Sequence, residues 1–144
     1  MLNVKVKYHK KYVGLLPIEI LKQGDFVDLR SAKDIELKEG DFTLIPLGVS
    51  MQLPEGYWGQ VVPRSSTFKK YGIIQVNSFG VIDESYCGDN DEWFMPVYAT
   101  RDTVIPMNER VCQFRIVKKE PFTISTVEVL GNEDRGGHGS TGRI

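Results

Sequence analysis

The residues best suited to catalysis or ligand binding lie between Gly80 and Asp89, in the run G-V-I-D-E-S-Y-C-G-D. Two apolar residues that favour strands lead into Asp83, and Tyr86 follows three positions later. Because Gly80 and Gly88 flank this run, the pattern predicts a β-hairpin with a tight tip. Such a tip can present one carboxylate and one aromatic ring to the same small cavity. Taken alone, the stretch would better fit an acidic surface turn.

A second group of polar residues precedes a short predicted helix at positions 65–72. The run Pro63-Arg64-Ser65-Ser66 ends where the helix begins, and a serine can cap that end. Two lysines fall in the last turn, and Gly72 suits the helix end. Helix N-termini attract anions, and the guanidinium of Arg64 matches phosphate oxygens. A capped helix with an arginine packed beside it is the alternative.

The end of the chain is rich in glycine and polar residues from Gly131 onward. Glycines let backbone N–H groups approach phosphates closely, Arg135 supplies charge, and Ser140 and Thr141 supply hydroxyls. The run lacks the G-K-[ST] signature of a P-loop. Because this segment has little apolar surface to bury, we expect a mobile arm. Its alternative is a mobile terminus that binds no ligand.

Two further polar residues lie within apolar strands. Alternation along the strand at 111–117 places Val111, Gln113 and Arg115 on one face. A buried Gln113 would need a hydrogen-bond partner, either a ligand or a loop backbone. Asp28 is either a structural acceptor or a distant contributor to a metal shell, and we favour the structural role.

The elements that must position these residues are mostly short strands. Apolar and alternating runs separated by Gly, Pro and Asp favour an all-β sandwich or barrel with one short helix. The predicted strands cover residues 2–8, 25–31, 42–49, 57–62, 72–76, 93–98, 111–117 and 122–129.

Bulk properties limit the class of protein. With 144 residues and 41% hydrophobic content, the chain fits one soluble domain. A net charge of −1 does not favour wholesale binding to nucleic acid, so a nucleotide ligand should be small. Cys87 and Cys112 form no metal-type pair and fit a reducing compartment. We see no leader and no membrane-spanning run, and therefore expect a cytoplasmic protein without membrane contact.

These groups, in this order, resemble the five motifs of the trimeric dUTPase family (deoxyuridine triphosphate nucleotidohydrolases), in its phage and Gram-positive branch. The match covers nearly the whole chain, and the second and third motifs are the most specific. In chain order the motifs are Asp25–Ala32, Pro63–Ser66, Asn77–Gly88, Arg110–Gln113 and Arg135–Gly142.

The resemblance implies a jelly-roll-like β-barrel over residues 1–130 and a flexible C-terminal arm over 131–144. It also implies a homotrimer in which the arm closes over a neighbouring subunit's site. If a phage encodes the protein, its compartment would be the host cytoplasm.

The activity implied is Mg²⁺-dependent hydrolysis of dUTP to dUMP and pyrophosphate. Asp83 would activate a water for in-line attack on the α-phosphorus, and Tyr86 would pack against the deoxyribose and reject a 2′-hydroxyl. Mg²⁺ would be held mainly by phosphates and waters, with Asp28 reaching its shell through a water. The resemblance assigns substrate binding to Arg64, Ser65, Ser66, Asn77, Gly80, Val81, Ile82, Tyr86, Gln113, Arg135, His138, Ser140 and Thr141.

Two positions depart from the family pattern. His138 stands where the arm usually carries a phenylalanine that stacks on uracil, and stacking contributes about 1–3 kcal/mol. We expect another aromatic residue to take this role, with Trp93 the first candidate and His138 the second. Phe26 stands where the first motif usually has glycine, which favours a structural role for that motif.

Two other functions remain open at this level. A dCTP deaminase shares the fold but needs an additional acid–base glutamate and a serine-rich arginine segment, which we do not find. A dUTPase-like trimer could instead act mainly as a regulator that binds another protein, through the loop at 89–92 or the segment at 120–122. Retention of Asp83, Tyr86 and Arg64 favours catalysis.

Overall fold

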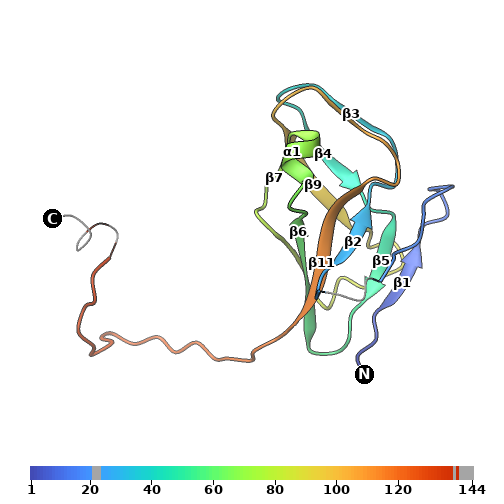
Figure 1. Ribbon diagram of the computed structural model, residues 1–144. Coiled ribbons are helices and arrows are strands. Elements are labelled where there is room, and N and C mark those ends of the chain that lie inside the picture. The colour runs from blue at the N-terminus through green and yellow to red at the C-terminus, as the bar shows by residue number, and fades with distance from the viewer. Residues whose placement is uncertain (21–23, 138, 140–144) are drawn as a thin grey trace.

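Short strands carry nearly all the regular structure of this chain (Figure 1). The computed structural model describes residues 1–20, 24–137 and 139. Within them the elements are β1 (Lys5–Tyr8), β2 (Val27–Arg30), β3 (Ile35–Leu37), β4 (Phe42–Pro46), β5 (Val49–Gln52), β6 (Tyr57–Pro63), α1 (Thr67–Tyr71), β7 (Ile73–Gln75), β8 (Gly80–Ile82), β9 (Phe94–Ala99), β10 (Thr103–Ile105) and β11 (Arg110–Lys118).

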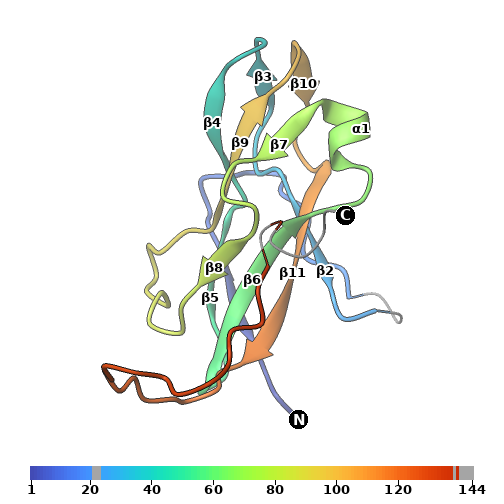
Figure 2. The same cartoon turned by 90° about the vertical axis from the view of Figure 1, so that its left-hand side faces the viewer.

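Antiparallel pairing joins these strands into a jelly-roll-like barrel, as the sequence predicted. The largest sheet has the order β2-β11-β6-β8, and a second has the order β4-β9-β7. Two-stranded ribbons β1-β5 and β3-β10 complete the wall. Figure 2 shows β6, β11 and β2 side by side, with β7 and β9 above them. The long β11 therefore spans the barrel, with Arg110 at one end and Lys118 at the other.

The core fills the space between these sheets. It gathers inward-facing side chains of several strands, among them Ile45, Met95, Val97, Ile105 and Val111. Alternation predicts most of this set, because buried and exposed residues take turns along β3, β7 and β9. The chain thus buries a continuous apolar interior without a second domain.

The helix forms where the sequence predicted it, but its start is stabilised differently. Ser66 makes no side-chain capping bond. Instead the Thr67 hydroxyl accepts from Arg64 N–H at 2.9 Å and donates to the Val111 carbonyl at 3.0 Å. At the other end Gly72 has φ of +66°, and a Cβ there would lie 2.6 Å from Arg101 Nε. Only glycine fits this position easily.

The predicted hairpin around Asp83 is wrong. Strand β8 pairs with β6, with Ile82 opposite Gly59, while β9 belongs to the other sheet. Between them, side chains hydrogen-bond the backbone in place of a strand ladder. Asp83 Oδ2 accepts from Ser85 N–H at 2.8 Å, and Asp91 Oδ2 accepts from Gly88 N–H at 2.8 Å. Such Asp-centred turns compete with extended pairing.

The predicted strand at 122–129 is also wrong. Strand β11 ends at Lys118, and residues 120–130 are exposed and extend away from the body (Figure 1). The alternating apolar pattern is present, but this chain offers it no neighbouring strand. The exposed segment therefore begins well before the predicted boundary at residue 130.

Alternation also fails at the start of β11. Val111 and Cys112 are both buried, because the register with β2 shifts between Arg110 and Cys112. This β-bulge separates Val111 from the face that carries Gln113. Burial raises the pKa of the Cys112 thiol, whereas Cys87 is exposed; both are free.

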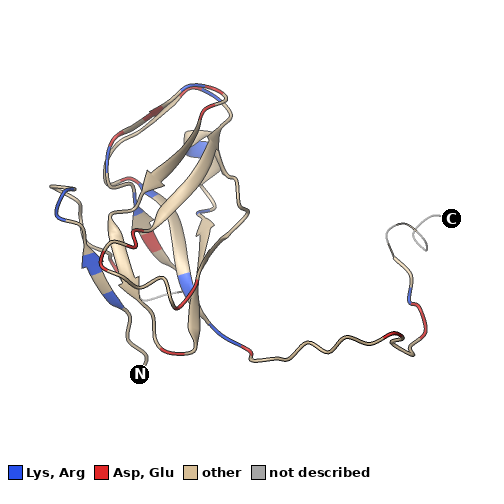
Figure 3. Cartoon of the chain, turned by 180° about the vertical axis from the view of Figure 1, so that it is seen from behind, with Lys and Arg blue, Asp and Glu red and all other residues tan. Residues whose placement is uncertain are grey.

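Charged residues of both signs are interspersed over the body and its loops (Figure 3). No helix in the described part of the chain is long and apolar enough to cross a membrane.

Candidate active site

A cleft of about 380 Å³ opens beside the C-terminal end of β8. Its walls come from β8, from the turns that follow it and from the start of β9. The lining residues are Val81, Ile82, Asp83, Ser85, Tyr86, Glu92, Trp93 and Phe94. The predicted base and the predicted sugar-facing aromatic residue therefore line one cavity, although no hairpin holds them.

The carboxylate of Asp83 is exposed and held from two sides. Oδ2 accepts from Ser85 Oγ at 2.5 Å and from Ser85 N–H at 2.8 Å, and Oδ1 lies 3.9 Å from Lys119 Nζ. Hydrogen bonds from Ser85, aided by the charge of Lys119, lower the pKa of Asp83 below its usual value. Asp83 is therefore ionised at neutral pH and able to accept a proton.

The Tyr86 ring lines the cleft, and its hydroxyl is fixed by a hydrogen bond. Its O–H donates to the Glu92 carbonyl at 2.7 Å, and 38% of the residue remains exposed. Burial raises the pKa of Tyr86 above its usual value, so the phenol stays protonated. A fixed hydroxyl and a free ring face suit a role in packing against a ligand.

Trp93 has a different position from the one its predicted role requires. It is 1% exposed, and its ring packs edge-on against Phe114 with centroids 5.2 Å apart. A ring buried in this way offers no free face to a base, so the geometry argues against stacking by Trp93. The exposed aromatic side chains in the cleft wall are Tyr86 and Phe94.

Three residues predicted to read the uracil edge lie around β8. Gly80 is buried, Val81 is exposed and Ile82 is half-buried, all in register with β6. Asn77 is exposed in the preceding turn, where its Oδ1 accepts from Gln75 Nε2 at 3.0 Å. Of these residues, Val81 and Ile82 line the cleft.

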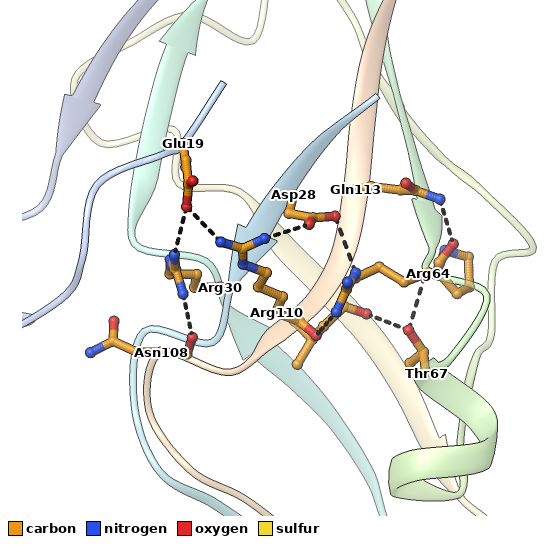
Figure 4. Close-up of polar contacts among 10 residues, drawn as sticks. Glu19, Asp28, Arg30, Arg64, Thr67, Asn108, Arg110 and Gln113 are labelled. Atoms are coloured by element: carbon orange, nitrogen blue, oxygen red, sulfur yellow. Dashed lines mark hydrogen bonds and ion pairs between the residues drawn. The ribbon is translucent and has the colours of Figure 1, made fainter. Parts of the chain in front are cut away.

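A cluster of arginines lies where the end of β6 meets the start of β11, at the end of these strands away from the Asp83 cleft (Figure 4). Asp28 on β2 joins it, with Oδ1 3.1 Å from Arg64 Nε and Oδ2 3.3 Å from Arg110 Nη1. Arg110 Nη2 also lies 2.6 Å from Glu19 Oε2. Both oxygens of Asp28 are therefore engaged with arginines, which supports the structural role that the sequence favoured.

The other predicted phosphate ligands surround this cluster. Ser65 and Ser66 are exposed at the start of α1. Gln113 Nε2 donates to the Pro63 carbonyl at 3.2 Å, so its amide orients the loop that carries Arg64. Together these groups can offer an anion a planar cation and several hydroxyls.

The arginine cluster and the Asp83 cleft are well separated within one chain. Ile82 pairs with Gly59 of β6, whereas Gln113 pairs with Val62 near the other end of the same strand. At about 3.3 Å per residue, Asp83 and Arg64 are roughly 20 Å apart along β6. Within one chain the two groups therefore lie near opposite ends of β6.

Of the predicted arm residues, Arg135 is described and exposed. His138, Ser140 and Thr141 lie outside the described residues. No group of three or more His, Cys, Asp or Glu in the described part of the chain could hold a metal.

Sequence reasoning missed three groups that bear on the site. Ser85 and Lys119 hold Asp83, and Arg110 shares Asp28 with Arg64. Ser85 and Arg110 lie inside the motifs already recognised, so their positions were a usable signal. Lys119 had none, because its proximity to Asp83 depends on how β11 ends beside the start of β6, which in turn pairs with β8.

The sequence profile of the dUTPase family matches residues 26–142, most of the chain. This chain belongs to the dUTPase family. Among its relatives is the SPbeta prophage-derived deoxyuridine 5′-triphosphate nucleotidohydrolase YosS of Bacillus subtilis (strain 168). It is 57% identical over 143 residues, which cover 98% of this chain and 99% of that protein. The predicted membership of the phage and Gram-positive branch is thereby confirmed.

Solved dUTPase structures share the fold. The dUTPase from Streptococcus mutans superposes with a TM-score of 0.73 at 26% identity, over 82% of this chain and 98% of that one. An aspartate-to-asparagine mutant of the dUTPase from phage phi11 of S. aureus gives a TM-score of 0.77 at 18% identity, over 89% of this chain and 98% of that one. That phage enzyme coordinates a structural Mg(II) ion.

Proposed function

We propose that this protein hydrolyses dUTP to dUMP and pyrophosphate. The observation that carries the proposal is the shared cleft of Asp83 and Tyr86 in a chain of the dUTPase family. The relative at 57% identity is named a deoxyuridine 5′-triphosphate nucleotidohydrolase, which supports the same substrate here.

Asp83 acts as the general base. Its ionised carboxylate orients a water and takes one of its protons while the water oxygen attacks the α-phosphorus. The new P–O bond forms as the bond from the α-phosphorus to the bridging oxygen breaks, and pyrophosphate leaves with that bond's electron pair. The low pKa of Asp83 keeps the base available at neutral pH and below.

Tyr86 and the β8 edge select the nucleoside. The Tyr86 ring packs against the deoxyribose and leaves no space for a 2′-hydroxyl. Backbone groups of Gly80 to Ile82, with Asn77, pair with the uracil edge and leave a buried group unpaired when cytosine enters. With Trp93 buried, Phe94 becomes the candidate for stacking on the base, because it is exposed in the cleft wall.

The arginine cluster binds the phosphates. Asp28 orients Arg64 and Arg110, while Ser65, Ser66 and Gln113 add hydrogen bonds. Since both Asp28 oxygens contact arginines, we place Mg²⁺ chiefly on phosphate oxygens and waters, in keeping with its octahedral preference. When bound, Mg²⁺ would neutralise part of the triphosphate charge.

The separation of the two groups implies that one active site uses more than one chain. We propose a homotrimer in which Asp83 of one copy faces the arginine cluster of the next. The arm with Arg135, Ser140 and Thr141 would close over a neighbour's phosphates, and its His138 is a second candidate for stacking on the base.

An exposed apolar face of the β4-β9-β7 sheet supports this assembly. Phe42 and Leu44 on β4, Phe94 and Tyr98 on β9 and Ile74 on β7 are all exposed, and Tyr98 pairs with both Phe42 and Ile74. Large exposed apolar patches mark interfaces. Phe94 belongs to this face and to the cleft wall, so a second copy seated there would adjoin Asp83.

Pyrophosphate release from dUTP, dCTP, dTTP and UTP in parallel tests the proposal. We expect selective release from dUTP that disappears in Asp83→Asn. Release of ammonia from dCTP would instead indicate the deaminase alternative, and equal rates with all four nucleotides would rule the proposal out.

A further inference from the structure

Glu92 lies in the wall of the cleft, yet only 5% of it is exposed. A buried carboxylate is costly unless it is partnered. Glu92 Oε2 accepts from the Tyr12 hydroxyl at 3.1 Å, and Oε1 lies 3.9 Å from Lys11 Nζ. Both partners come from the N-terminal segment, behind the cleft wall and outside its set of lining residues.

Tyr12 is held rigidly enough to fix this carboxylate. Its N–H donates to the His9 carbonyl, and its own carbonyl accepts from Leu15 N–H, both at 3.2 Å. Gly48 has φ of +73°, and a Cβ there would lie 3.3 Å from Tyr12 Cδ2. The ring thus packs directly on backbone. Burial and the bond to Glu92 raise the pKa of Tyr12 to about 12, so its hydroxyl remains a donor.

The main chain of Glu92 holds the sugar-facing residue. Its carbonyl accepts from Tyr86 O–H at 2.7 Å. The next residue is fixed to the barrel, because Trp93 N–H donates to the Val49 carbonyl at 2.8 Å and the Trp93 carbonyl accepts from Leu47 N–H at 3.0 Å. A continuous chain of contacts therefore runs from Tyr12 through Glu92 to Tyr86.

We infer that Tyr12 and Glu92 are positioning residues for sugar selection, acting through Tyr86. They set the depth of the Tyr86 ring and hence the space beside the 2′ carbon of the substrate. The role assigned to both side chains is exerted through the position of Tyr86. The inference rests on the proposed function, because it concerns discrimination between dUTP and UTP. It predicts that loosening this contact chain admits a 2′-hydroxyl without removing the catalytic base.

The test is the ratio of kcat/KM for dUTP to kcat/KM for UTP. Tyr12→Phe removes one hydroxyl and keeps the ring on Gly48; we expect the ratio to fall about three- to tenfold, as for loss of one hydrogen bond. Glu92→Ala should lower it at least as far. Glu92→Gln keeps an acceptor for the Tyr12 hydroxyl, so its ratio should be close to that of the wild-type protein.

Tyr8→Phe is the matched control. It removes a hydroxyl from the same N-terminal segment, one that accepts from Ile18 N–H at 2.9 Å away from the cleft. A merely structural defect reduces the folded fraction and scales both substrates equally, so the ratio stays constant.

An unchanged ratio in Tyr12→Phe, or an equal fall in Tyr8→Phe, would overturn the inference while wild-type dUTP hydrolysis stood. If the wild-type protein released no pyrophosphate from dUTP, the proposed function would fail and the inference with it.

Discussion

At the scale of single residues, the proposed chemistry depends on how the exposed carboxylate of Asp83 is oriented by its neighbours. Asp83 is exposed, so its hydrogen-bond partners rather than burial determine the pKa of its carboxyl group. Ser85 supplies two donors to Oδ2, and Lys119 lies 3.9 Å from Oδ1. Donors to a carboxylate favour its charged form and lower its pKa.

This arrangement makes a prediction about pH. Because the pKa of Asp83 is lowered, activity should persist as pH falls below the ordinary range of an aspartate. Ser85→Ala removes the hydroxyl donor and should move the acidic limb of the kcat/KM profile to higher pH. Thr103→Val, which removes a hydroxyl from β10 outside the cleft, is the control. An acidic limb at the same pH in wild type and Ser85→Ala would contradict this role for Ser85.

At the scale of elements, Glu109, which directly precedes β11, links that strand to α1 through two side-chain contacts. Glu109 Oε1 accepts from Tyr71 O–H at 2.6 Å and lies 3.0 Å from Lys70 Nζ. Hydrogen bonds from Tyr71 and Lys70 lower the pKa of Glu109. This junction precedes Arg110 and so supports the arginine cluster.

Tyr71→Phe should lower the free energy of unfolding by about 1 kcal/mol at neutral pH, the usual net value of a hydrogen bond. Because the folded pKa of Glu109 is lowered, this stabilisation exists above the unfolded pKa and is lost as pH falls through the folded one. Denaturant unfolding at several pH values measures it. The difference from wild type should shrink in acid; a constant difference would argue against Glu109 as the partner.

Tyr57→Phe is the control for this measurement. The Tyr57 side chain makes no hydrogen bond to another described residue, so its loss should leave unfolding nearly unchanged at every pH.

Local patterns predicted strands β6, β9 and β11 and the helix end at Gly72. They missed the short strands β3 and β10, although Ile35 and Leu37 of β3 face the core. The hairpin around Asp83 was mispredicted because side-chain contacts of Asp83 and Asp91 close turns there. The strand at 122–129 was mispredicted because a pattern cannot report whether a partner strand exists.

The site was predictable as residue types but not as distances. The motifs identified Asp83, Tyr86, Arg64 and Gln113, yet the separation of Asp83 from Arg64 follows from the pairing of β6 with both β8 and β11. The burial of Trp93 likewise depends on its long-range packing against Phe114. Neither fact is encoded in a local run of residues.

At the scale of the whole molecule, the proposed trimer, with each site divided between two subunits, predicts complementation between subunits. Asp83→Asn and Arg64→Ala trimers should each be inactive. A co-expressed sample that assembles at random should recover about a quarter of wild-type activity, because about three quarters of its trimers are mixed and each mixed trimer has one intact site of three. Pyrophosphate release from the co-expressed sample measures this. No recovery in trimers of verified mixed composition would place both groups in a single chain's site.

The central claim is that Asp83 directs a water onto the α-phosphorus of dUTP. Hydrolysis in ¹⁸O-labelled water, with mass spectrometry of both products, tests it most directly. We predict one ¹⁸O atom in dUMP and none in pyrophosphate, with turnover abolished in Asp83→Asn. Label in pyrophosphate would place the attack on another phosphorus and contradict the account.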